Sequence, residues 1–367
     1  MKITRIRLWH VPLTSHATYY MAAGKSCATV ETVVLAIDTD TGRTGWGEVC
    51  PIPHYLPAYA RGVAPALTDL APVLIGGDPL GAETLTARVA KHLPGHLYAR
   101  SALDIAFWDL TGQEADLPLY ALLGGRQQAD LPLYHSITCT DPDEMARIAT
   151  DAQAQGMTQF QAKLGAGGDW ATDVERLRAV RAAIGPGPIL YGDWNCGTTS
   201  LTASRVGRAV ADLDVMLEQP CETLEECARV RAATGLPMKL DELAWDTASL
   251  LEAHRLGILD AVALKLSKFG GLSALRRARD LCLHLGPVMC IEDTWGSDIA
   301  MAAALHLAAT TDPARLLNVC DLSGYVAPRL APDGPTRAAG RIAPPERPGL
   351  GLTPDLDLLG PPDFILD

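Results

Sequence analysis

Between residues 131 and 322 the sequence repeats one pattern, a short apolar run followed by an amphipathic helical segment. The runs lie at 131–137, 159–165, 188–194, 215–220, 237–242, 261–267, 287–293 and 316–322. The segment 249–258, SLLEAHRLGI, is typical of the helical patterns between the later runs. Short apolar strands that alternate with helices predict a parallel sheet, and eight of them at a spacing of roughly 25 residues predict a closed β/α barrel.

The residues before this pattern predict a different kind of domain. Residues 3–12 alternate like a β-strand and residues 31–38 are a β-branched run typical of one, whereas residues 64–123 change to a helical period. The residues after the barrel are rich in Pro and Gly. We therefore expect three parts: an α+β domain at 1–128, the barrel at 129–328, and a C-terminal segment at 329–367 that returns to the first domain.

Charge and composition exclude several classes of function. The 367 residues carry a formal net charge of −12, so no basic surface is expected that could neutralise nucleic-acid phosphates. No apolar run reaches transmembrane length, and the N-terminus MKITRIRLWH lacks the apolar core of a signal peptide. The nine cysteines are scattered without a CxxC pair, which is typical of a reducing compartment. We expect a cytoplasmic protein without nucleic-acid or membrane partners.

Acidic side chains follow three successive predicted strands. They are Asp193, Glu218 and Asp241, one strand–helix unit apart. Because neighbouring parallel strands lie about 4.8 Å apart, three carboxylates at their ends would repel one another. A hard divalent cation resolves that conflict, and all-oxygen ligation favours Mg²⁺ over zinc. In the alternative interpretation, each acid pairs with a basic residue or caps the next helix.

Two lysines flank these acids in the sequence. Lys163 precedes them and Lys265 follows them, so the barrel would place one amine on each side of a metal-bound substrate. A partly desolvated lysine beside a cation has a lowered pKa and can act as a base. A metal-bound carboxylate would stabilise the enediolate that α-proton removal creates. Lys268 is expected to face away or to support Lys265.

Several motifs together resemble the enolase superfamily, in its muconate-lactonizing and mandelate-racemase branch. They are GWGE (45–48), SALDIAFWDLTGQ (101–113), LPLYALLGG (117–125), GDWN (192–195), LEQP (217–220), KLDE (239–242) and LKLSKFGGL (264–272). The resemblance implies an α+β capping domain over a modified (β/α)8 barrel of the TIM type, (β/α)7β. It also implies Mg²⁺, or Mn²⁺, at Asp193, Glu218 and Asp241, with Lys163 and Lys265 as the acid/base pair. Relatives often form dimers or octamers, so a homo-oligomer is expected.

One position departs from the pattern of many relatives. They carry Lys-x-Lys on the second barrel strand, whereas this chain has Gln161 in place of the first lysine. The second lysine of that pair, here Lys163, usually performs the chemistry. We therefore expect activity to survive, with a different tuning of the pKa of Lys163.

Three segments resemble enzymes that act on proline derivatives, the cis-3-hydroxy-L-proline dehydratases and the proline-betaine or hydroxyproline-betaine 2-epimerases. The segments are 93–110, 218–227 and 290–300. The resemblance implies α-proton removal from a small carboxylate, followed by dehydration or by racemisation or epimerisation. Asp321 would pair with a protonated secondary amine, which favours a free imino acid. Trp295 could instead offer an aromatic face to a quaternary ammonium.

The remaining substrate contacts are expected on loops. Residues 19–24 and 51–55 would close over the substrate, with His54 and Tyr55 as contacts, and either residue could instead pack between the domains. One of Glu292 and Asp293 should face the site, but a one-residue change of register would exchange them. The alternatives are a dipeptide or N-acyl amino acid racemase, a muconate-type cycloisomerase, a sugar-acid dehydratase, and a binding relative without catalysis.

Overall fold

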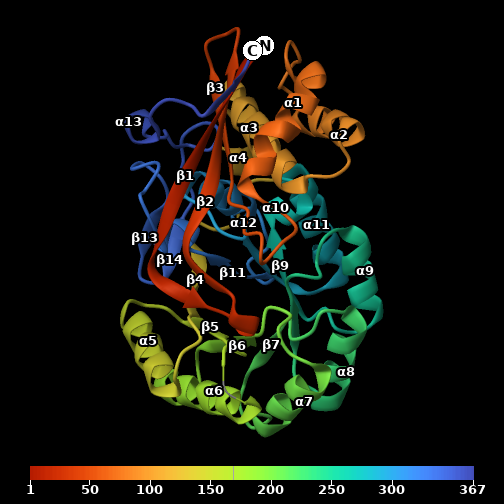
Figure 1. Cartoon of the computed structure of the whole chain (residues 1–367), viewed down its shortest axis with the longest axis vertical. Coiled ribbons are helices and arrows are strands. Elements are labelled where there is room, and N and C mark those ends of the chain that lie inside the picture. The colour runs from red at the N-terminus through yellow and green to blue at the C-terminus, as the bar shows by residue number, and fades with distance from the viewer. Residues whose placement is uncertain (168) are drawn as a thin grey trace.

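The computed structural model describes residues 1–167 and 169–367 and has two parts, an antiparallel sheet with helices and a parallel barrel (Figure 1). The capping domain begins with β1 (Ile3–Tyr20), β2 (Ser26–Thr39) and β3 (Thr44–Val49), in the order β1-β2-β3. Its helices are α1 (Val63–Leu74), α2 (Ala82–His92), α3 (Leu97–Ala115) and α4 (Leu119–Leu122), with 3-10 turns at Ala22–Gly24 and Ala60–Gly62.

The parallel barrel is closed, because its last strand pairs with its first, with Val319 opposite Leu133. The strands are β4 (Leu131–Ile137), β5 (Gln159–Lys163), β6 (Ile189–Asp193), β7 (Met216–Glu218), β8 (Met238–Leu240), β9 (Ala261–Lys265), β10 (Val288–Glu292) and β11 (Leu316–Cys320). The helices are α5 (Pro142–Ala154), α6 (Trp170–Ile184), α7 (Ser200–Ala209), α8 (Leu224–Thr234), α9 (Thr247–Arg255), α10 (Leu266–Phe269), α11 (Leu272–Leu285) and α12 (Asp298–Ala308). The predicted fold, an α+β capping domain with a β/α barrel, is confirmed.

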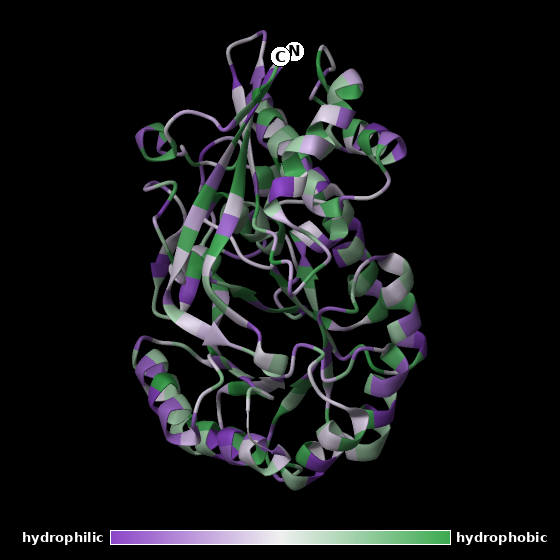
Figure 2. Ribbon diagram, in the orientation of Figure 1, coloured by the Kyte–Doolittle hydropathy of each residue, from purple (hydrophilic) through white to green (hydrophobic). Residues whose placement is uncertain are grey.

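The hydrophobic pattern explains why the barrel closes. All five residues of β9 are buried, as expected for a strand with helices on one side and the barrel interior on the other. The outer helices alternate hydrophilic and hydrophobic residues along their length (Figure 2), and α7 buries Ala203 and Val206 against the sheet. Burying one apolar stripe of each helix on the strands stabilises both layers.

The C-terminal segment pairs with both parts of the molecule. After the 3-10 turn Leu322–Gly324 come β12 (Val326–Ala327), β13 (Thr336–Ala338), β14 (Arg341–Ala343), α13 (Leu356–Leu359) and β15 (Phe364–Leu366). Strand β14 pairs with β4 of the barrel, whereas β12 and β15 pair with β1. No helix within residues 1–167 and 169–367 combines the length and apolar character needed to cross a bilayer.

Candidate active site

The polar residues at the carboxyl ends of the barrel strands lie opposite one another in two sets. Lys163 on β5 pairs with Asp193 on β6, which pairs with Glu218 on β7. Lys265 on β9 pairs with Glu292 on β10. Since neighbouring residues of a parallel sheet point to the same side, these charged side chains meet at one mouth of the barrel.

A lysine ammonium lies against each of the three acids. Lys163 Nζ lies 2.5 Å from Asp193 Oδ2, and Lys239 Nζ lies 2.9 Å from Glu218 Oε1. Asp241 faces two lysines, with Lys265 Nζ at 2.7 Å from Oδ2 and Lys268 Nζ at 2.9 Å from Oδ1. All these side chains are buried, so the charges interact with little screening by water.

Burial and neighbouring charge shift the pKa values here in different directions. Burial, with the charges of Asp193 and Asp241, raises the pKa of Glu218 to about 7, although Lys239 opposes the shift. Burial acts to lower the pKa of Lys163 and Lys265, but the carboxylates of Asp193 and Asp241 outweigh it and the pKa of both lysines is raised. The sequence predicted a lowered pKa for these lysines. The structure shows the opposite, because the acids lie directly against the lysines and stabilise their charged form.

The carboxylate oxygens at this mouth of the barrel are the type of ligand that a hard divalent cation prefers. Across residues 1–167 and 169–367, no group of three or more His, Cys, Asp or Glu side chains is arranged around a common metal position. Each predicted ligand is turned towards a lysine instead. Two nearby buried oxygens, Asn195 Oδ1 and Glu242 Oε2, have no hydrogen-bond partner in the described part of the chain. Burial together with the charges of Asp241 and Asp193 raises the pKa of Glu242 to about 8, so further negative charge is disfavoured here without a cation.

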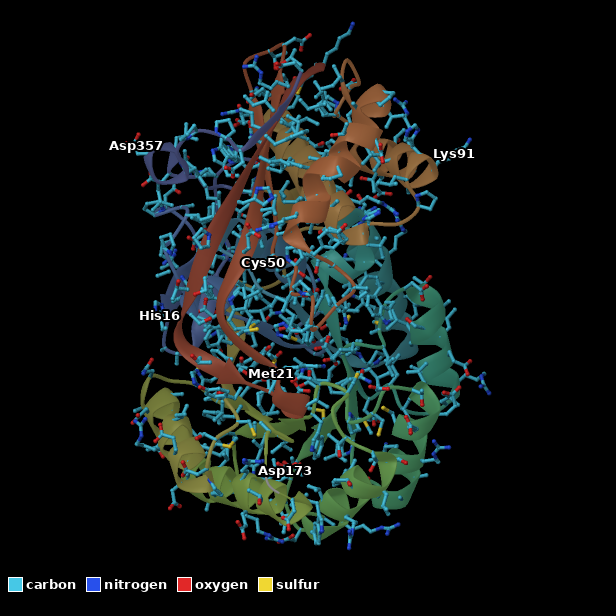
Figure 3. The ribbon with its side chains drawn as sticks, viewed as in Figure 1. His16, Met21, Cys50, Lys91, Asp173 and Asp357 are labelled. Atoms are coloured by element: carbon cyan, nitrogen blue, oxygen red, sulfur yellow. The ribbon has the colours of Figure 1, made fainter. Side chains whose placement is uncertain are left out.

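A cavity of about 60 Å³ opens above these charges, between the barrel and the capping domain. The capping domain contributes its lining from two segments, the end of β1 with the following turn and the loop after β3. The lining residues include Tyr19, Met21, Ile52, Tyr55, Lys163, Asp241, Lys265, Glu292, Asp293 and Trp295. Figure 3 shows Met21 where the β1–β2 hairpin reaches over the barrel. A pocket between two domains, with a few convergent polar groups at its base, is a typical place for a small substrate.

The structure brings three of the five expected substrate contacts to this cavity. Tyr55, Trp295 and Asp293 line it. Asp321 does not, because its carboxylate forms an ion pair with Arg337 at 2.5 Å and accepts a hydrogen bond from Gly324 N. His54 is exposed outside the cavity, with Nε2 3.7 Å from Cys27 Sγ.

Both parts of the chain match protein-family models. Residues 144–358 match the model described as enolase C-terminal domain-like. Residues 3–124 match the mandelate racemase / muconate lactonizing enzyme N-terminal domain. The chain belongs to the enolase superfamily.

Among its enolase-superfamily relatives is the cis-3-hydroxy-L-proline dehydratase of Roseibium aggregatum. The two sequences are 41% identical, over 99% of each chain. The L-Ala-D/L-Glu epimerase of Bacillus subtilis is 28% identical, over 96% of this chain and 97% of that protein. A solved structure from Roseovarius nubinhibens, a putative mandelate racemase/muconate lactonizing enzyme complexed with magnesium, is 36% identical over all of both chains, with a TM-score of 0.94. This enolase-superfamily chain is an enzyme of the lyase or isomerase type.

Both candidate residues at the end of β10 face the site of this enolase-superfamily enzyme. Glu292 Oε2 accepts a hydrogen bond from Tyr134 at 2.8 Å, and its Oε1 lies 3.8 Å from Lys265 Nζ. Asp293 Oδ1 accepts hydrogen bonds from Ser267 N and Thr294 N. The expectation that only one of the two acids would face the site was wrong, because the strand ends at Glu292 and the chain turns there.

Sequence reasoning missed several contacts of the site. Gln161 Nε2 donates to Glu218 Oε2 at 2.7 Å, so the glutamine at the position of the first family lysine holds a predicted metal ligand. Lys239 was also missed. A lysine within an apolar strand is buried, and a buried ammonium needs a carboxylate partner, so its position was a usable signal. The ring of Tyr325 lies 5.4 Å from that of Tyr19 and 6.2 Å from that of Trp295, which makes an aromatic wall. No sequence spacing joins these three rings.

Proposed function

We propose that the protein removes the α-proton of a proline-derived carboxylate and eliminates its 3-hydroxyl group, the reaction type of a cis-3-hydroxy-L-proline dehydratase. The placement of Lys163 and Lys265 is the observation that carries this proposal. Their strands, β5 and β9, are four strands apart in a closed barrel of eight, so the two amines face each other across the cavity. An amine on each face of the substrate suits removal of the α-proton on one face and protonation of the leaving 3-hydroxyl group on the other.

We propose that Asp193, Glu218 and Asp241 hold Mg²⁺ in the working enzyme, after turning away from the lysines. The burial and crowding of the three acids and the magnesium in the Roseovarius structure support this assignment. The bound cation would supply positive charge to the substrate carboxylate as negative charge develops on it. With the acids engaged, Lys163 and Lys265 would lose the charge that raises their pKa, and one of them could act as a base.

The two lysines can supply both proton transfers that the elimination needs. One lysine accepts the α-proton, and the electron pair of that C–H bond forms a double bond as the 3-hydroxyl leaves. The second lysine, while protonated, donates the proton that turns the leaving hydroxide into water. The enamine product tautomerises to a cyclic imine.

The imino nitrogen of the substrate needs an anionic partner, and Asp293 is the side chain we assign to it. Asp293 lines the cavity, and its buried Oδ2 has no hydrogen-bond partner within the described residues. A protonated secondary amine would satisfy that oxygen. Asp321, the residue expected for this role, is held by Arg337.

A second candidate function, epimerisation of a proline betaine, is favoured by one specific observation. Tyr19, Trp295 and Tyr325 form an aromatic wall at the cavity. Such a wall suits a quaternary ammonium, which cannot donate a hydrogen bond to Asp293.

Proton NMR in D₂O with Mg²⁺ tests both functions on a panel of proline, the hydroxyprolines and their betaines. We expect loss of the α-proton signal of cis-3-hydroxy-L-proline together with a dehydrated product. Exchange of a betaine without loss of water would favour the epimerase. No exchange with any panel member would overturn the proline-derivative assignment.

Tyr55 gives a prediction for the capping domain. Its hydroxyl donates to Asp241 and accepts a hydrogen bond from Lys265 Nζ at 2.7 Å. We expect Tyr55→Phe to lower kcat about tenfold or more, because both partners lose a fixed hydrogen bond in a buried site. His54→Ala, one residue away and exposed, is the matched control and should change kcat less than about twofold. Steady-state kinetics on both variants decides, and equal losses would contradict a specific role for Tyr55.

A further inference from the structure

A carboxylate of the capping domain is buried at the start of a barrel helix. Glu48, at the end of β3, is 0% exposed. It accepts hydrogen bonds from Ser297 N at 2.8 Å, Ser297 Oγ at 2.7 Å and Ala300 N at 2.8 Å, all at the N-terminus of α12. Thr32 Oγ1 on β2 donates a fourth at 2.7 Å. Burial raises the pKa of the Glu48 carboxyl, whereas the hydrogen bonds from Ala300, Thr32 and Ser297 act to lower it, as does the helix dipole.

Two glycines explain how Glu48 reaches this position. A Cβ atom on Gly47 would lie 1.9 Å from Ala102 O, and one on Gly45 would lie 2.5 Å from Ala106 O. Only glycine therefore lets β3 lie directly against α3. That close packing brings the end of β3 to the barrel, where Glu48 meets α12.

The N-terminus of α12, to which Glu48 is hydrogen-bonded, directly follows the residues that line the cavity. Asp293, Thr294 and Trp295 line the cavity, and Ser297 follows Trp295 by two residues. Gly296 between them has little free space, since a Cβ there would lie 2.8 Å from Ala300 Cβ. The path from Asp293 to the first turn of α12 is thus short and closely packed.

We infer that Glu48 is a positioning residue that sets substrate affinity by fixing segment 293–297 from the other domain. This inference rests on the proposed function, in which Asp293 contacts the substrate nitrogen, and on Trp295 lining the same cavity. Glu48 touches no substrate itself. Lys163 and Lys265, which perform the chemistry, lie on other strands and do not depend on it.

A second buried acid of the capping domain supplies the matched control. Asp109 accepts hydrogen bonds from Trp46 N at 2.8 Å and Leu350 N at 2.7 Å and is nearly as buried as Glu48. Its partners lie in the capping domain and the C-terminal segment, and none lines the cavity. Asp109→Asn therefore repeats the chemical change of Glu48→Gln without touching segment 293–297.

The experiment combines hydrogen exchange with kinetics on the full-length enzyme with Mg²⁺. In Glu48→Gln the side-chain amide places an N–H group towards Ala300 N or Ser297 N, which leaves a buried donor unpaired. We expect faster amide exchange in the peptide 293–301, measured without substrate by mass spectrometry. We also expect KM to rise about tenfold while kcat changes less than about threefold. Ser297→Ala, a milder change, should move exchange and KM in the same direction.

Asp109→Asn should leave both the exchange of peptide 293–301 and KM unchanged, whatever its effect on the melting temperature. Equal KM values in Glu48→Gln and wild type, or an equal rise in Asp109→Asn, would overturn the inference. If Glu48→Gln does not fold, Ser297→Ala decides by the same two measurements. If the wild type turns over no panel member, the proposed function fails. Unchanged amide exchange of peptide 293–301 in Glu48→Gln would separately overturn the positioning role, because that measurement needs no substrate.

Discussion

Replacement of Lys265 by alanine is expected to lower turnover at least ~10³-fold, because the proposed mechanism loses a proton-transfer group that water cannot replace at that position. Lys265 lines the cavity, and its Nζ is held by Asp241 at 2.7 Å and by the Tyr55 hydroxyl at 2.7 Å. The measurement is the loss of the substrate α-proton signal in D₂O, followed beside the wild type. Turnover within about tenfold of wild type would exclude Lys265 from the chemistry.

Lys265→Arg is the matched control for charge. Arginine keeps a positive group beside Asp241 but stays protonated at any pH the enzyme tolerates, so it cannot accept the α-proton. We expect it to fold with the stability of the wild type and to be as inactive as Lys265→Ala. An active arginine variant would show that Lys265 contributes charge alone.

Replacement of Glu218 by leucine should remove Mg²⁺ binding and also destabilise the protein strongly. Lys239, 0% exposed, would lose the carboxylate that lies 2.9 Å from its ammonium. An unpaired buried charge typically costs about 3–5 kcal/mol of unfolding free energy. Urea unfolding without metal measures this loss, and titration calorimetry with Mg²⁺ measures binding.

A double variant separates these two effects. Glu218→Leu combined with Lys239→Met removes both charges and should recover most of the stability, since an apolar pair of similar volume replaces a buried ion pair at little cost. It should still fail to bind Mg²⁺. Recovery of stability without recovery of binding assigns Lys239 to the structure and Glu218 to the metal. A double variant that binds Mg²⁺ normally would contradict the assignment of Glu218 as a ligand.

The barrel could be predicted from the sequence because its strands are buried on both sides. Each predicted run contains the observed strand, but the ends differ where polar residues take over. The run 237–242 is a strand only at Met238–Leu240, since Asp241 begins the loop that carries the site. The run 261–267 ends at Lys265, because Leu266–Phe269 forms a short helix. Strand β1 is longer than predicted, because β2 and β12 pair with residues beyond Pro12.

Lys163, Asp193, Glu218 and Lys265 stand out in the sequence because each is the last residue of its strand, where a polar residue interrupts an apolar run. The loop contacts could not be predicted, since their positions depend on pairing between distant segments. Asp321 was expected at the substrate, but Arg337, sixteen residues later, binds it. The role of Glu48 was equally hidden, because its donors at Ser297 and Ala300 lie 249 and 252 residues further along the chain.

The pairing of β1 with β15 has a consequence for synthesis of the chain on the ribosome. Leu8 pairs with Phe364, so one edge of β1 finds this neighbour only after about 350 further residues have been made. At translation speeds of about 5–20 residues per second, that interval lasts roughly 20–70 s. During this time the edge of β1 offers unpaired backbone groups to other nascent chains. Chaperone demand and expression temperature should therefore affect the yield of this protein through the exposed edge of β1.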